Sequence, residues 1–195
     1  MKFYCLLYKD FETLDMFGPV EILGRTKDSE MHFLSAEGGI VTSVHGVPVM
    51  TEKTEAFAAG SVLVIPGGIG TRPLVQSKAY LDMLKALSDQ AEYVLTVCTG
   101  SALLAKSGAL DGRSATSNKL SFEWVKTNSD AVSWQGSARW VHDGKFYTAS
   151  GISAGLDMAL GFVADVFGKE EAQASADWLE YIWNDDCSRD PFAVE

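Results

Sequence analysis

The chain has 195 residues, of which 47% are hydrophobic and 22% are charged, and its formal net charge is −10. This length allows one α/β domain with a full core, so we expect residues 1–195 to form a single domain. The acidic balance argues against broad binding to nucleic-acid phosphates. Three widely spaced cysteines without a CxxC pair predict a reducing compartment. The apolar start is too short for a signal peptide or a membrane span, which favours the cytoplasm.

Apolar runs alternate with helical patterns along the chain. Residues 3–8 are typical of a short buried strand, and a helix is expected from Asp15, with Pro19 within or near its first turn, to Gly24. Further strands are expected at 31–36, 62–65, 93–97, 131–133, 138–141 and 145–148, hairpin turns at His45-Gly46 (within 39–50) and Asp143-Gly144, and helices at 73–90, 101–107, 153–167 and 169–183. This alternation predicts an α/β fold with a mainly parallel central sheet, helices on both faces and small antiparallel hairpins.

The most informative segment is residues 96–100, Thr-Val-Cys-Thr-Gly, which ends an apolar strand and opens a helix. A side chain on such a turn projects into the crevice where α/β proteins bind ligands. The free N–H groups and positive dipole of the following helix would favour a thiolate at Cys98. We therefore predict that Cys98 is a nucleophile. We interpret Cys5 as a buried core residue and Cys187 as a residue without a catalytic role.

A nucleophilic thiol needs a proton donor or acceptor nearby. The three histidines lie in a strand or in hairpins and not at a strand end, so the sequence does not support a Cys-His dyad. Asp15 follows the first strand at the same sheet edge; it can serve as a plain helix cap or as a carboxyl group beside the sulfur. In the second case its pKa would be raised and it would carry a proton at neutral pH. Asp10 and Glu12 are nearby alternatives in a more solvated loop.

Two further corners should meet Cys98. The glycine-rich turn at 65–70 lacks the third glycine of a dinucleotide loop, and its bare backbone allows a close approach to a ligand. The N–H groups of Gly68 and Thr99 can form an oxyanion hole, unless the turn is only structural. The corner at 150–157 places Ile152 and Ser153 at the substrate site, although Ser153 can equally cap its helix. No HExxH, P-loop, zinc-ligand spacing or GxSxG occurs, so we expect no metal and no nucleotide cofactor.

Taken together, these pieces resemble the ThiJ/PfpI family of the class I glutamine amidotransferase-like superfamily. The matching segments are residues 14–19, 64–68, 97–101, 108–116 and 151–157. They appear in the expected order, and the resemblance spans nearly the whole chain. It implies a flavodoxin-like sandwich, usually assembled as a homodimer.

Within this family, the combination of Asp15, Cys98 and Thr99 looks most like the isonitrile hydratases. That resemblance implies a cysteine nucleophile, an aspartate acid/base and an assisting threonine, acting on a small molecule without a cofactor, a membrane or nucleic acid. Many relatives have a histidine where this chain has Asn118, and peptidase-like members have one in place of Thr99. The predicted reaction is hydration of an isonitrile to an N-substituted formamide. The alternatives are glyoxalase-like or deglycase-like chemistry on methylglyoxal, and a non-catalytic cysteine-based sensor or stress protein.

Overall fold

The computed structural model describes residues 1–54, 58 and 60–194. Its main sheet has eight strands in the order β3-β4-β2-β1-β5-β6-β10-β9, and two short strands, β7 and β8, pair separately. The strands are β1 (Lys2–Leu6), β2 (Glu30–Ser35), β3 (Gly39–Thr42), β4 (Pro48–Lys53), β5 (Val62–Ile65), β6 (Tyr93–Val97), β7 (Ser114–Ala115), β8 (Ser133–Trp134), β9 (Trp140–Asp143) and β10 (Phe146–Ala149). The central strands β1, β2, β5, β6 and β10 pair in parallel, and the hairpins β3–β4 and β9–β10 are antiparallel. The predicted mainly parallel sheet with antiparallel additions is confirmed.

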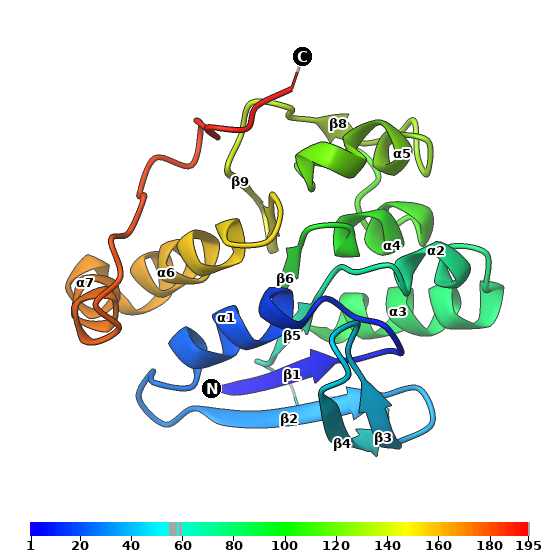
Figure 1. Ribbon diagram of the computed structural model, residues 1–195, viewed down its shortest axis with the longest axis horizontal. Coiled ribbons are helices and arrows are strands. Elements are labelled where there is room, and N and C mark those ends of the chain that lie inside the picture. Colours follow the sequence, from blue (N-terminus) through cyan, green and yellow to red (C-terminus); the bar gives the residue numbers. More distant parts are fainter. Residues whose placement is uncertain (55–57, 59, 195) are drawn as a thin grey trace.

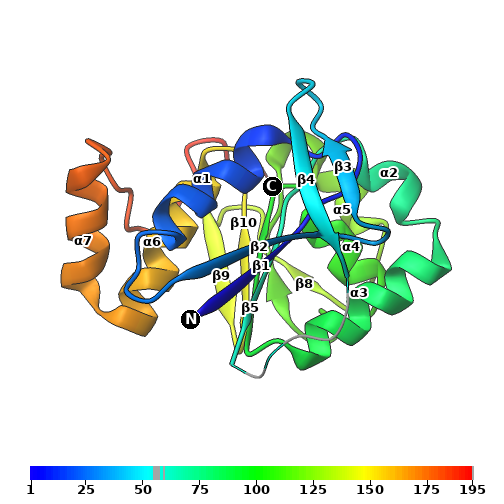
Figure 2. The same cartoon turned by 90° about the horizontal axis from the view of Figure 1, so that it is seen from below.

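Helices cover both faces of this sheet (Figures 1 and 2). They are α1 (Thr13–Leu23), α2 (Thr71–Leu74), α3 (Lys78–Gln90), α4 (Gly100–Lys106), α5 (Phe122–Lys126), α6 (Ala154–Phe167) and α7 (Lys169–Trp178), with a 3-10 turn at Lys119–Ser121. In Figure 2, α1, α6 and α7 lie on one side of the strands, and α2, α3 and α4 lie on the other. Every residue of β5 is buried, as expected for a parallel strand covered on both faces. The flavodoxin-like architecture is therefore confirmed.

Several predicted boundaries are wrong. Helix α1 begins at Thr13, with Glu12 at its N-cap, so Asp15 lies inside the first turn and Pro19 lies in the helix interior. The single helix predicted at 73–90 is two helices, because Ser77 adopts an extended conformation and its side chain accepts the Tyr80 N–H, which starts α3 afresh. Leucine periodicity runs through this break and conceals it.

The C-terminal part differs most from the prediction. Helix α7 ends at Trp178 and not near 183, because the backbone turns at Glu180, whose φ is +51°. The segment from 184 to 194 then follows the loop before β9 and β9 itself, where the N–H of Arg139 donates to the carbonyl of Cys187 and the N–H of Asp190 to that of Ser137. The short elements β7, the 3-10 turn and α5 were not predicted. In the described part of the chain, no helix has the length and apolarity needed to cross a bilayer.

Candidate active site

Cys98 occupies a sharp corner between β6 and α4 at the carboxyl edge of the sheet. Its φ is +58°, in the left-handed region that residues other than glycine rarely adopt. The Cys98 N–H donates to the carbonyls of Ala149 (3.1 Å) and Ser150 (3.0 Å), at the end of β10. The Cys98 carbonyl accepts the Ser117 hydroxyl at 2.8 Å. These bonds tie the corner to two neighbouring segments and fix the direction in which the thiol projects.

The structure brings Asp15 to this thiol, as the sequence predicted. Asp15 is fully buried, its Oδ2 accepts the Gly67 N–H at 2.9 Å, and its carboxyl group lies beside the Cys98 side chain. Its Oδ1 is buried and has no hydrogen-bond partner among the described residues. Asp15 does not cap α1. Because a buried carboxyl oxygen without a partner is costly in a purely structural role, the arrangement favours a chemical role.

Both groups of this pair hold their protons tightly. Burial raises the pKa of Asp15 to about 8, with a further increase from the nearby Glu12, in the direction that the sequence analysis expected for a carboxyl group beside the sulfur. Burial and the adjacent Asp15 raise the pKa of the Cys98 thiol well above its ordinary value. The N–H of Thr99 favours the thiolate but is outweighed. The predicted resting thiolate is therefore wrong: at neutral pH the site holds a thiol beside a mostly protonated carboxyl group.

Gly67 is the point where the site residues converge. A Cβ atom at this position would lie 2.6 Å from the Thr99 nitrogen and 2.8 Å from both Asp15 Oδ2 and Cys98 Cβ. No real Cβ tolerates such contacts with backbone and fixed side chains. Glycine is therefore required here so that the strand end of β5 can pack directly against the Asp15–Cys98 pair.

We expect Gly67→Ala to lower the free energy of unfolding by about 1–3 kcal/mol, because the site is overpacked, and to lower any Cys98-dependent activity at least tenfold by separating Asp15 from the thiol. Urea denaturation and steady-state kinetics measure the two effects. Gly18→Ala is the matched control, since its Cβ would meet only side chains, those of Leu156 at 3.3 Å and Leu14 at 3.7 Å. Wild-type stability in Gly67→Ala would contradict the close packing described here.

The structure gives Thr99 and Gly68 a shared role. The Thr99 hydroxyl oxygen accepts the Gly68 N–H at 3.0 Å and lies 3.3 Å from the Gly68 carbonyl. The Gly68 N–H is thus already paired and is not free for the oxyanion role that the sequence suggested. The Thr99 backbone N–H instead faces the Cys98 sulfur. Thr99 therefore holds the glycine turn with its side chain and approaches the Cys98 sulfur with its backbone.

A cavity of about 210 Å³ opens onto the thiol. Its walls come from strand ends and helix starts along one sheet edge. The lining residues are Glu12, Gly68, Ile69, Arg72, Cys98, Thr99, Asn118, Leu120, Ser121 and Ile152. Ile152 is at the cavity, as expected, whereas Ser153 lines only an adjoining larger pocket, and its side chain does not cap α6.

Arg72 is the main lining residue that the sequence analysis missed. Its guanidinium donates to the Ser121 hydroxyl at 3.1 Å and stacks on the Trp124 ring, 3.3 Å from the ring centroid. It therefore places a fixed positive charge at the cavity wall. A sequence signal is lacking, because Arg72 follows the glycine turn at no recognisable spacing and its partners lie about fifty residues further along the chain.

No histidine lines this cavity, in agreement with the sequence argument against a Cys-His dyad. His45 lies outside it, 3.6 Å from Glu12 and 2.9 Å from the Thr13 hydroxyl.

Asn118 lines the cavity, where its side chain accepts the Ser121 N–H at 3.0 Å and so starts the 3-10 turn. Within the described ranges, no three His, Cys, Asp or Glu side chains gather to hold a metal ion.

A model of the DJ-1/PfpI family matches residues 1–165. The chain belongs to this family. In sequence it is 33% identical to the isonitrile hydratase of Pseudomonas putida over 177 residues, which cover 90% of this chain and 76% of that protein. It is 28% identical to the deglycase PfpI of Pyrococcus furiosus, over 60% of this chain and 72% of that protein.

Other DJ-1/PfpI similarities concern regulation and fold. The chain is 28% identical to the transcriptional regulator CdhR of Pseudomonas aeruginosa over 72% of its own length, but this covers only 42% of the regulator. A crystal structure of a ThiJ/PfpI family protein from Pseudomonas syringae superposes with a TM-score of 0.84 and 27% identity, covering 92% of this chain and 74% of that one. Proteins similar to this chain thus include both enzymes and regulators.

Proposed function

We propose that this protein is an isonitrile hydratase, which adds water to an isonitrile to give an N-substituted formamide. The observation that carries the proposal is the buried Cys98 thiol beside Asp15, a buried carboxyl group whose Oδ1 has no hydrogen-bond partner among the described residues. The similarity to the P. putida isonitrile hydratase supports the same reaction.

The reaction needs two additions at one atom. The terminal carbon of R–N≡C must receive both a nucleophile and a proton to become an imidate carbon. A thiol beside a protonated carboxyl group supplies both from one side of the substrate. A preformed thiolate is not required, because the proton that leaves the sulfur can pass to the carboxyl group as the carboxyl group releases its own.

In the first half-reaction, the Cys98 sulfur bonds to the terminal carbon and its proton passes to one oxygen of Asp15. The other oxygen of Asp15 delivers a proton to the same carbon. The product is a thioimidate, R–N=CH–S–Cys98, and Asp15 is again protonated. The unpartnered Oδ1 is the oxygen that we assign to proton delivery.

In the second half-reaction, water attacks the imidate carbon. Asp15 accepts a proton from this water and donates one to the substrate nitrogen, which gives a tetrahedral adduct bearing hydroxyl and thioether groups. The adduct collapses: the C–S bond breaks, the hydroxyl proton returns to sulfur through Asp15, and R–NH–CHO leaves. In this scheme Thr99 holds the glycine turn beside the reacting carbon.

The direct test is turnover of an alkyl or aryl isonitrile by the purified protein, with formamide followed by chromatography. We expect cofactor-free formation of one formamide per isonitrile, and none with Cys98→Ala. The result that rejects the proposal is an inactive wild-type protein, or a Cys98→Ala variant with undiminished turnover.

Deglycase-like or glyoxalase-like chemistry is the second candidate, favoured by the 28% identity to the P. furiosus deglycase. In that case Cys98 would form a hemithioacetal with methylglyoxal. The histidine-free cavity weighs against it. Lactate production from methylglyoxal at a rate above that of isonitrile hydration would favour this candidate.

A redox-sensor role receives less support, because oxidation is easiest for an accessible thiolate and Cys98 is a buried thiol with a raised pKa.

The pH dependence follows from Asp15. Because its pKa is raised to about 8, the group carries the required proton below this value and loses it above. We expect kcat/KM for an isonitrile to be level between about pH 6 and 7 and to fall about tenfold per pH unit well above pH 8. A profile measured in overlapping buffers checks this. An increase in kcat/KM from pH 8 to 9 would contradict the acid role of Asp15.

A further inference from the structure

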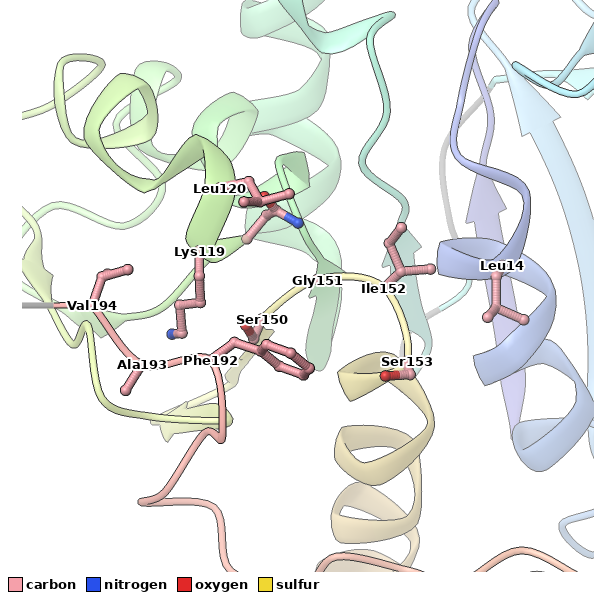
Figure 3. A pocket seen from close by; sticks show the side chains of 11 residues that line it. Leu14, Lys119, Leu120, Ser150, Gly151, Ile152, Ser153, Phe192, Ala193 and Val194 are labelled. Atoms are coloured by element: carbon pink, nitrogen blue, oxygen red, sulfur yellow. The ribbon is translucent and has the colours of Figure 1, made fainter.

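A second and larger cavity, of about 620 Å³, adjoins the cavity of Cys98. The two share three lining residues, Asn118, Leu120 and Ile152. A molecule whose reactive end lies at the thiol can therefore extend past these residues into the larger space. We call this larger space the side pocket (Figure 3).

The side pocket is lined mainly by apolar side chains, several of which are unusually exposed. Leu120 is 99% exposed and Phe192 is 71% exposed, although both are large and apolar. Figure 3 shows the Phe192 ring reaching from the C-terminal segment toward Ser153, with Ile152 and Leu14 beyond it. Contiguous exposed apolar surface beside a reactive group is typical of a binding site for an apolar ligand.

One wall of the side pocket comes from outside the family-matched region. Phe192, Ala193 and Val194 line it, whereas the family model ends at residue 165. The wall is fixed to the rest of the molecule at two points, where the N–H of Asp190 donates to the Ser137 carbonyl at 2.8 Å and that of Val194 to the Gly136 carbonyl at 3.3 Å. This wall of the side pocket is thus built by residues that the family model does not include.

A buried charge cluster holds this wall in place. The Asp190 side chain is fully buried, its Oδ1 accepts the Phe192 N–H at 3.0 Å, and the same oxygen lies 3.7 Å from Arg139 Nη1. Arg139 Nη2 is 2.7 Å from Asp157 Oδ2. Lys119, which also lines the pocket, lies 4.0 Å from Asp190 Oδ2. These contacts join the C-terminal segment, through Asp190, to Arg139 and Lys119 in the interior.

We propose that the C-terminal segment 190–194 is the specificity element of this enzyme, with Phe192 packing against the substituent R of the substrate and Asp190 acting as its positioning residue. The substrate class is isonitriles with a bulky apolar substituent, such as a benzyl group. The isonitrile part of this inference rests on the proposed function; the affinity of the side pocket for an apolar group does not.

The kinetic test compares benzyl isonitrile with methyl isonitrile in wild type, Phe192→Ala and the control Ile182→Ala. Ile182 is 93% exposed and lines neither cavity. We expect Phe192→Ala to lower kcat/KM for benzyl isonitrile about tenfold, mainly through KM, and to change that for methyl isonitrile less than about twofold. Asp190→Asn should shift KM in the same substrate-selective way. Equal effects of Phe192→Ala on both substrates, or no effect on either, would overturn the proposal.

A binding measurement separates this inference from the proposed reaction. Calorimetry with the unreactive amides N-benzylformamide and N-methylformamide should show tighter binding of the benzyl compound to wild type, and about tenfold weaker binding of it to Phe192→Ala. If no isonitrile is turned over but this binding pattern is observed, the proposed reaction is rejected and the proposed role of the side pocket is retained. If isonitriles are hydrated but the benzyl compound binds no better than the methyl compound, only the proposed role of the side pocket is rejected.

Discussion

Asp15→Asn should lower kcat/KM for isonitrile hydration by about 10³-fold, the range typical of a lost general acid/base. An asparagine amide fits the same space and can still accept the Gly67 N–H, which is the bond that Asp15 Oδ2 makes. It cannot give up and regain a proton at neutral pH. Steady-state kinetics on a soluble isonitrile measure the loss. Asp15→Glu is the matched control, because it keeps the acid and should retain more activity than Asp15→Asn.

The same substitution should stabilise the protein at alkaline pH. The pKa of Asp15 is about 8 in the folded state and has a reference value of 3.8, so the folded state binds more protons than the unfolded state between these values. Wild-type stability therefore falls as the pH rises through this window. Asparagine does not ionise, so Asp15→Asn should unfold at higher urea concentration than wild type at pH 9, by on the order of a few kcal/mol, with little difference near pH 4.

The two results together distinguish a chemical role from a structural one. If Asp15 served only to hold the fold, Asp15→Asn would be less stable at pH 9 and its lost activity would follow its lost stability. A variant that is inactive yet more stable than wild type shows that the buried carboxyl group is kept at a cost to stability for its chemistry. Lower stability of Asp15→Asn at pH 9 would contradict the raised pKa.

Arg139→Ala should have the largest effect on stability, a loss of about 3–5 kcal/mol in the free energy of unfolding. Arg139 is 7% exposed and lies between two fully buried carboxylates, with its Nε and Nη2 bonding Asp157 and its Nη1 near Asp190. Its removal leaves both carboxylates with far less compensation in a low-dielectric interior. The loss should appear as a lower midpoint in urea denaturation followed by circular dichroism.

Lys78→Ala provides the matched control for Arg139→Ala. Lys78 forms an ion pair with Asp82 at the surface of α3, and its side chain is 87% exposed. Exposed pairs of this kind contribute about 0.3–0.5 kcal/mol. A loss in Arg139→Ala no larger than in Lys78→Ala would show that the cluster beneath the C-terminal segment is not a stabilising anchor.

The strand–helix corners were predictable from the sequence because their signals are local. The residues of β5 and β6 form mainly apolar runs that are followed within three residues by glycine, and Cys98 comes directly after β6. The meeting of Asp15 with Cys98 was also predictable, since both follow parallel strands and thus lie at the same sheet edge. The start of α1 was misplaced because Asp is a preferred N-cap residue type, whereas Glu12, the actual N-cap, makes no side-chain cap hydrogen bond.

Other features depended on contacts between distant segments. The pKa of Cys98 was predicted to fall because the helix dipole is visible in the sequence, whereas the burial that raises it is not. The pairing of Thr99 with Gly68 joins residues 31 positions apart. Asp190 lies in an acidic stretch of the sequence, yet it is buried against Arg139. No local sequence pattern indicates that the C-terminal segment packs against Arg139, about fifty positions earlier in the chain.

The central claim is that Cys98 and Asp15 add a thiol across the terminal carbon of an isonitrile. Intact-protein mass spectrometry after rapid acid quench of a substrate-saturated reaction tests it most directly. We predict a transient adduct equal to the full mass of the isonitrile, because the addition expels no leaving group, located at Cys98 by peptide mapping and absent in Cys98→Ala. Formamide produced without such an adduct in a time course that resolves the first turnover, or an adduct mapped to another residue, would contradict the account.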